Sequence, residues 1–88
     1  MNALKEVAGA LCGINNPSQM RKFLAELFTP AELEDTALRW RLLKMLKAGR
    51  TQREIASELN ISLCKITRGS KILKDRDSAI NQILGELK

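Results

Sequence analysis

Residues 51–71 read TQREIASELNISLCKITRGSK and predict two short helices joined by a tight turn. Thr51 can cap the first helix, and Glu54, three residues later, completes a capping box. Asn60 falls where the chain must turn, because Asn tolerates a left-handed backbone better than most other residues. A small residue, Ala56, is followed by Asn60 and then by the apolar Ile61, which is the spacing of a helix-turn-helix. Two ordinary packed helices can show the same pattern, so the charge distribution has to decide between the two interpretations.

The surplus positive charge of the chain lies on and beside this motif. Residues 47–76 hold eight Lys or Arg and three Asp or Glu, whereas the rest of the chain is electrically balanced. The net charge of +5 therefore belongs to this stretch. Such an excess is typical of a surface that binds a polyanion, since a merely solvated helix face mixes both signs. Nucleic acid is the predicted partner.

Helical spacing of apolar residues and capping signals predict an all-α fold of about six short helices without strands. The expected helices cover residues 2–12, 17–28, 30–48, 52–59, 62–74 and 77–88. Asp75 or Asp77 is the expected cap of the last helix, whose apolar stripe runs to Leu87. The third helix carries two apolar strips, so it is expected to be the central one. The strips are Ala31, Leu38, Leu42 and Met45 on one side and Leu33, Ala37 and Trp40 on the other.

The 88 residues predict a single helix-turn-helix domain over residues 1–88. Its expected parts are dimerisation helices at 1–48, the helix-turn-helix at 51–74 and a C-terminal helix at 77–88. The first two helices have wide apolar faces, and so short a chain has little else to cover them. We therefore expect an intertwined two-fold dimer, which would present two reading helices to successive major grooves of DNA.

Composition excludes several classes of function. The chain contains no His and no Tyr, and its glycines are isolated, so no catalytic group, cofactor or metal site is expected. No stretch approaches the roughly 20 apolar residues of a membrane span, and no signal peptide is evident. Cys12 and Cys64 lack metal-ligand spacing and read as small filler residues. As free thiols they fit a reducing cytoplasm, the predicted location.

Two stretches resemble the tryptophan operon repressor family. One is Ile66-Thr67-Arg68-Gly69-Ser70 together with the first motif helix, and the other is residues 27–32, Leu-Phe-Thr-Pro-Ala-Glu. The resemblance covers about residues 20–74. It implies a sequence-specific DNA-binding repressor, active as a homodimer and activated for operator binding by L-tryptophan as co-repressor.

The resemblance also implies the residues that hold the co-repressor. Arg39 and Arg68 would sandwich the indole, since guanidinium planes stack on aromatic rings and pair with carboxylates. Thr29 would join Arg68 at the carboxylate, and Gly69 would leave room for the ring. Backbone carbonyls of the partner chain at about 26–28, ending at Phe28, would receive the ammonium. From the residues alone, a surface ion pair of Arg39 with Asp35 and a phosphate contact of Arg68 are the alternatives.

The chain departs from the family pattern in two places. Ile72 stands where the family has a serine that helps bind the amino group of the ligand, and it offers no polar atom. The loop at 48–50, Ala-Gly-Arg, is one residue shorter than in the best-known repressors and is similar to that of the YerC/YecD group of Trp-repressor-like proteins. An effector other than tryptophan, or none, is therefore the alternative prediction.

The residues expected to contact DNA fall into two groups. Arg53 is the first choice for a direct base contact, because a bidentate arginine suits a guanine edge. Its group comprises the residues that face the groove: Gln52, Arg53, Leu63, Cys64, Lys65 and Thr67. The second group comprises phosphate contacts, which position the protein without choosing a sequence: Arg41, Lys71 and Lys74. A small basic protein that binds nucleic acid without sequence choice is the alternative of another class.

Overall fold

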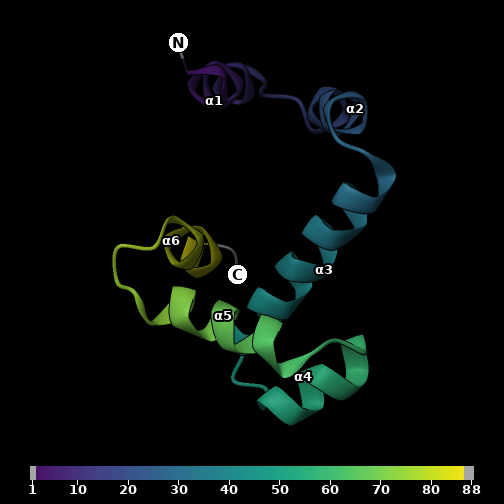
Figure 1. Cartoon of the computed structure of the whole chain (residues 1–88). Helices are drawn as coiled ribbons and strands as arrows, with labels where there is room; N and C mark the ends of the chain where they lie inside the picture. Colours follow the sequence, from purple (N-terminus) through teal and green to yellow (C-terminus); the bar gives the residue numbers. More distant parts are fainter. Residues whose placement is uncertain (1, 87–88) are drawn as a thin grey trace. The chain divides into compact units, whose positions relative to one another are not determined.

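The structure, a computed structural model, describes residues 2–86, which form six helices and no strand (Figure 1). The helices are α1 (Ala3–Gly13), α2 (Pro17–Leu27), α3 (Pro30–Lys47), α4 (Gln52–Leu59), α5 (Leu63–Lys74) and α6 (Ala79–Glu86). The predicted all-α fold with six short helices is confirmed. The chain forms two compact units, residues 1–34 and 35–88, so the division falls inside α3. The predicted single domain with a dimerisation part at 1–48 stays a prediction.

In the first unit, each helix begins at a polar capping residue that can be recognised in the sequence. The side-chain oxygen of Asn2 accepts a hydrogen bond from the Lys5 N–H, and that of Asn16 accepts two, from Ser18 and Gln19. Thr29 and Glu32 form a reciprocal capping box at the start of α3, with distances of 3.1 and 2.8 Å. These bonds satisfy backbone N–H groups that a helix start leaves without partners.

The apolar residues of the first unit are at most partly covered. No residue of α1 or α2 is buried. Leu4 is 76% exposed and Leu27 is 48% exposed. Helices of this length are marginal in water unless an apolar face is packed. The sequence thus builds two amphipathic helices whose apolar faces are only partly buried within the described chain.

The core lies in the second unit and is aliphatic. Leu42 of α3, Ile55 and Leu59 of α4 and Ile66 of α5 form its buried cluster. Ile55 and Ile66 are completely buried, each at 0% exposure. Burying such a side chain contributes about 1.5–3 kcal/mol relative to leaving it exposed. The two motif helices are therefore anchored on the C-terminal half of α3 by their own inner faces.

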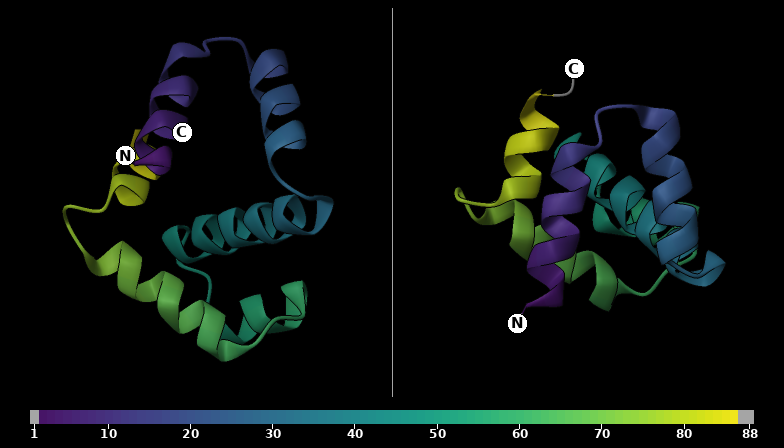
Figure 2. Two further views of the ribbon diagram at one scale, coloured as in Figure 1. Left: turned by 45° about the horizontal axis from the view of Figure 1, so that its top comes forward. Right: turned by 90° about the horizontal axis from the view of Figure 1, so that it is seen from above.

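Two tight turns set the angles between these helices. Gly49, at φ = 89°, ends α3 with the paired hydrogen bonds of a Schellman motif, from Gly49 N–H to Leu46 O and from Arg50 N–H to Met45 O, both 3.0 Å. Asn60 ends α4 in the left-handed conformation, at φ = 54° and ψ = 51°, as predicted. The turn after Asn60 joins α4 and α5 at an open angle, which the left view of Figure 2 shows clearly. This is the helix-turn-helix.

The C-terminal helix differs from the prediction at its start. α6 begins at Ala79 rather than at 77, and Ser78, not Asp75 or Asp77, accepts the capping hydrogen bond, from the Asn81 N–H at 3.1 Å. The Asp75 carboxylate instead accepts from the Asp77 N–H, which closes a local turn between α5 and α6. Leu87 of the predicted stripe lies outside the described residues.

Candidate functional site

The first turn of α4 is fixed by a small polar cluster. The Thr51 hydroxyl accepts from the Glu54 N–H, and Glu54 accepts from the Thr51 N–H, so the predicted capping box is present. Arg50 bridges Glu54 at 3.1 Å and Glu58 at 3.0 Å. The hydrogen bonds from Thr51 lower the pKa of Glu54, with Arg50 adding to the effect. Arg50 is thus already paired with two carboxylates of α4, so it is not a free cation for a polyanion.

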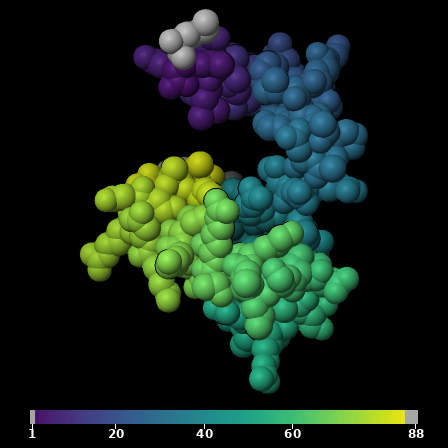
Figure 3. All heavy atoms as spheres, viewed as in Figure 1, coloured from purple at the N-terminus to yellow at the C-terminus, as the bar shows by residue number. Residues whose placement is uncertain are grey.

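The residues predicted to contact DNA are exposed on α3, α4 and α5. Gln52 and Arg53 begin α4, whereas Leu63, Cys64, Lys65 and Thr67 lie in the first half of α5. Lys71 and Lys74 follow in the last turns of α5, and Arg41 is on α3. In the space-filling view, α5 and the neighbouring end of α4 form one continuous surface, coloured green (Figure 3). Within the described chain, none of these cations is paired with a carboxylate.

The groove-facing positions of α5 differ in their chemistry. Leu63, 54% exposed, presents an apolar surface at the first helical position. The Thr67 hydroxyl donates to the Leu63 carbonyl at 2.9 Å, so its lone pairs remain available as acceptors. Cys64 is an exposed free thiol. Ser62 occupies the capping position before α5 but makes no side-chain hydrogen bond to the helix.

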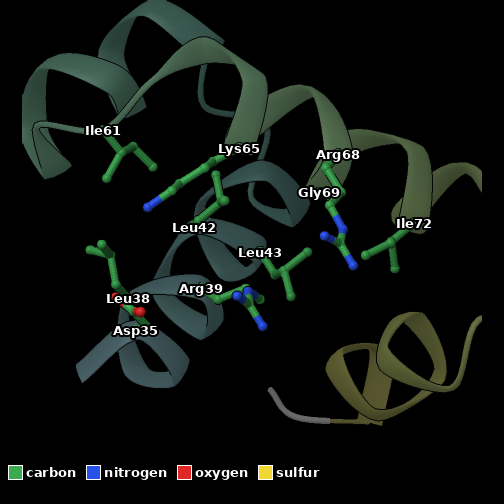
Figure 4. A pocket seen from close by; sticks show the side chains of 10 residues that line it. All are labelled: Asp35, Leu38, Arg39, Leu42, Leu43, Ile61, Lys65, Arg68, Gly69 and Ile72. Atoms are coloured by element: carbon green, nitrogen blue, oxygen red, sulfur yellow. The ribbon is translucent and has the colours of Figure 1, made fainter. Parts of the chain in front are cut away.

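A pocket of about 270 Å³ lies in the second unit between α3 and α5 (Figure 4). Four of the residues predicted to hold a ligand line it: Arg39, Arg68, Gly69 and Ile72. Both arginines are exposed, and no ion pair joins Arg39 to Asp35 in the described part of the chain, which argues against that alternative role. Ile72 is half-buried and contributes only aliphatic surface. The pocket combines two guanidinium groups with apolar walls.

The other two predicted ligand residues lie in the first unit. Thr29 caps α3, and its hydroxyl accepts the Glu32 N–H. Phe28 ends α2 and is 37% exposed. Their roles toward a ligand stay predictions.

Gly69 allows α5 to approach α3 closely. It is buried, and a methyl group at this position would lie 3.3 Å from Leu43 Cδ2, 3.3 Å from Leu46 Cδ1 and 3.6 Å from Leu42 Cδ2. The first two distances are tighter than ordinary van der Waals contact. Glycine therefore lets α5 pack against these leucines without displacing them, a role beside the predicted one of leaving room for a ring.

Sequence reasoning missed several lining residues. Asp35 and Leu38 stand one helical turn before Arg39 and Leu42, and Lys65 stands one turn before Arg68 and Gly69. The i, i+3, i+4, i+7 spacing from Lys65 to Ile72 marks one stripe of α5 and was the signal that could have found it. Lys65, predicted only as a DNA contact, thus belongs to the pocket as well.

The described residues contain no group of three or more His, Cys, Asp or Glu placed to hold a metal ion. Within the same range, none of the helices combines the length and the apolar character needed to cross a bilayer.

The fold and the exposed basic helix pair define a helix-turn-helix protein. The family model described as "Trp repressor protein" matches residues 2–88. A "Trp operon repressor homolog" of Chlamydia trachomatis is 39% identical over 71 residues, which is 75% of this chain and 76% of that protein. The homologs of Xylella fastidiosa and Chlamydia caviae are 37% identical over 68 residues (76% of this chain, 74% of the homolog) and 38% identical over 79 residues (88% and 78%). No solved structure matches significantly.

The chain belongs to the Trp repressor family, a family of transcription regulators rather than enzymes. This confirms the family that the sequence resemblance indicated, and it confirms the prediction that the protein is not an enzyme.

The packing at Gly69 generates a stability prediction. Gly69→Ala should lower the free energy of unfolding, because overpacking at Leu43 and Leu46 costs about 1–3 kcal/mol while the gain in helix propensity offsets about 1 kcal/mol. Chemical denaturation followed by circular dichroism measures the change. Gly85→Ala in α6 is the matched control, since nothing lies within 4 Å of its added methyl group. A Gly69→Ala protein more stable than the Gly85→Ala protein would contradict the packing role.

Proposed function

We propose that this protein is a sequence-specific DNA-binding repressor that acts in the cytoplasm as a homodimer and is controlled by a small aromatic carboxylate, with L-tryptophan as the first candidate. The observation that carries the proposal is the shared helix α5. One of its stripes lines the pocket, and the neighbouring stripe presents the exposed residues expected to face a DNA groove. A molecule in the pocket therefore touches the helix that would read DNA.

DNA binding is supported by the chemistry of the helix-turn-helix surface. Arg53 at the start of α4 has no carboxylate partner in the described residues, so it is free to donate to a guanine edge. Leu63 and Cys64 suit the methyl group of thymine, whereas Lys71, Lys74 and Arg41 suit phosphates. The relatives carry the name of operon repressor homologs, which agrees with operator DNA as the partner.

A dimer is supported by large apolar residues that the first unit leaves exposed. Leu4, Leu27 and Phe28 are large apolar residues exposed on or beside α1 and α2, neither of which contains a buried residue. A second copy of the chain would cover them and would pair two α5 helices for successive major grooves. In the family, the partner chain also supplies backbone carbonyls for the ligand's ammonium, which matters here because Ile72 offers no acceptor.

Control by the effector follows from differential binding. Stacking of the ring between Arg39 and Arg68, carboxylate pairing with Arg68, and ring contact with the apolar walls need both helices in place at once. A ligand of this kind stabilises the arrangement of α3 and α5 in which the pocket exists, and it shifts the population only by that difference in affinity. Thr29 would add to the carboxylate contacts, as the resemblance implies.

The base-reading role predicts unequal losses on different DNAs. Binding sites would first be selected from random duplexes with the wild-type protein. Arg53→Ala should then cost about 1–3 kcal/mol on the selected duplex and much less on a scrambled one, because it removes a base contact. Lys74→Ala, the control, should weaken both alike and flatten the salt dependence by about one unit. Equal losses on both duplexes for Arg53→Ala would point to binding without sequence choice.

The effector role predicts heat on mixing the protein with L-tryptophan in a calorimeter, and tighter binding to the selected duplex in its presence. Tryptamine is the matched ligand, since it keeps the ring and the ammonium but lacks the carboxylate that Arg68 and Thr29 would hold. It should give no heat. Absence of heat with millimolar L-tryptophan, with DNA binding unchanged, would remove tryptophan as the effector and leave a regulator with another effector or none.

The dimer predicts a sedimentation mass of twice the 9.9 kDa chain. Leu27→Glu should shift the protein toward monomer, because a charge buried in an apolar interface carries a desolvation cost of several kcal/mol. Lys22→Glu, an exposed position on the same helix α2, is the control and should leave the mass unchanged. A wild-type monomer at micromolar concentration would contradict this part of the proposal.

A further inference from the structure

The pocket between α3 and α5 has two polar ends of different chemistry. At one end, Arg39 and Arg68 direct their guanidinium groups toward the same space (Figure 4). Asp35 and Lys65 stand on the same two helices about one turn earlier and form the other end (Figure 4). Apolar side chains lie between them: Leu38, Leu42 and Leu43. The first end suits an aromatic ring that carries a carboxylate, whereas the second carries one charge of each sign.

Asp35 and Lys65 are both exposed, and neither takes part in an ion pair or a hydrogen bond recorded for the described residues. An ionised carboxylate only accepts hydrogen bonds, and an ammonium group only donates them. A hydroxyl group does both, so one hydroxyl oxygen can accept from Lys65 while its hydrogen is donated to Asp35. A ring N–H could serve Asp35 alone, and an unsubstituted ring edge could serve neither.

We infer that Asp35 and Lys65 form a polar subsite that selects an effector whose aromatic ring carries a hydroxyl group on the edge remote from its carboxylate. The inference rests on the proposed effector function of the pocket. The distance is suitable, because Asp35 and Arg39 are one helical turn apart, a rise of about 5–6 Å that one bicyclic ring system spans. Hydrogen bonds to charged groups are the stronger ones, so this end contributes selectivity as well as affinity.

Calorimetry with three ligands tests the subsite directly. The ligands are L-tryptophan, 5-hydroxy-L-tryptophan and 5-methoxy-L-tryptophan, which share the carboxylate, the ammonium and the ring. The wild-type protein should bind the hydroxy compound about tenfold more tightly than L-tryptophan, the low end for a hydrogen bond to an exposed charged group. The methoxy compound should lose this gain, since it keeps the oxygen but cannot donate to Asp35.

Variants then assign the effect to the two residues. Asp35→Ala should remove the preference for the hydroxy compound, measured as the ratio of its affinity to that of L-tryptophan, and Lys65→Met should reduce that ratio. Glu34→Ala is the matched control, because Glu34 is an exposed acid on the same helix that does not line the pocket. Circular dichroism of each variant establishes that it is folded before its affinities are compared.

The outcomes separate this inference from the function on which it rests. If the wild-type protein binds the hydroxy compound and L-tryptophan equally, the subsite is wrong while the effector function stands. A preference that survives in Asp35→Ala also overturns the subsite. If none of the three ligands binds, the proposed aromatic effector and the subsite both fail.

Discussion

The close contact between the backbone of α5 at Gly69 and the leucines of α3 is the constraint on which the rest of the second unit depends. Leu42, Leu43 and Leu46 would all lie within 3.6 Å of a methyl group at this position. Because glycine has no such group, α5 lies against α3, and Ile66 is buried completely one turn earlier. The opposite side of α5 is left exposed, and α4 follows it through the fixed turn at Asn60.

This packing gives α5 three distinct sides. Ile66 and Gly69 form the buried side, Leu63, Cys64 and Thr67 lie on the exposed side, and a stripe from Lys65 to Ile72 lines the pocket. The second helix of the helix-turn-helix, α5, therefore also forms one wall of the pocket. In a family of transcription regulators, such a placement supplies a physical route from a bound small molecule to DNA affinity.

Much of the fold could be predicted because its determinants are local. The capping box at Thr51, the left-handed turn at Asn60 and the glycine stop at Gly49 each depend on residues close together in the sequence. The predicted start of α6 was wrong because three nearby polar residues can each cap a helix: Asp75, Asp77 and Ser78. Only the local turn between α5 and α6 selects Ser78.

The site could be predicted only in part, because it depends on packing between distant segments. Leu43 is buried, although it belongs to neither of the two apolar strips expected for α3. It is buried because α5 packs against α3 at this point and widens the buried face. Asp35 and Lys65 line one pocket from two different helices, and each read more simply as a surface charge, because the spacing along one helix does not show which other helix it faces. Arg39 and Arg68 were found only through the family resemblance, since isolated arginines carry no pocket signal of their own.

We propose that an occupant of the pocket fixes α5, the helix expected to face the DNA groove. Amide hydrogen exchange of the full-length protein, with and without saturating L-tryptophan, measures this most directly. The account predicts slower exchange along α5 and α4 when the ligand is bound, with α1 changing least. Unchanged exchange in α4 and α5 while calorimetry shows the ligand bound would contradict it.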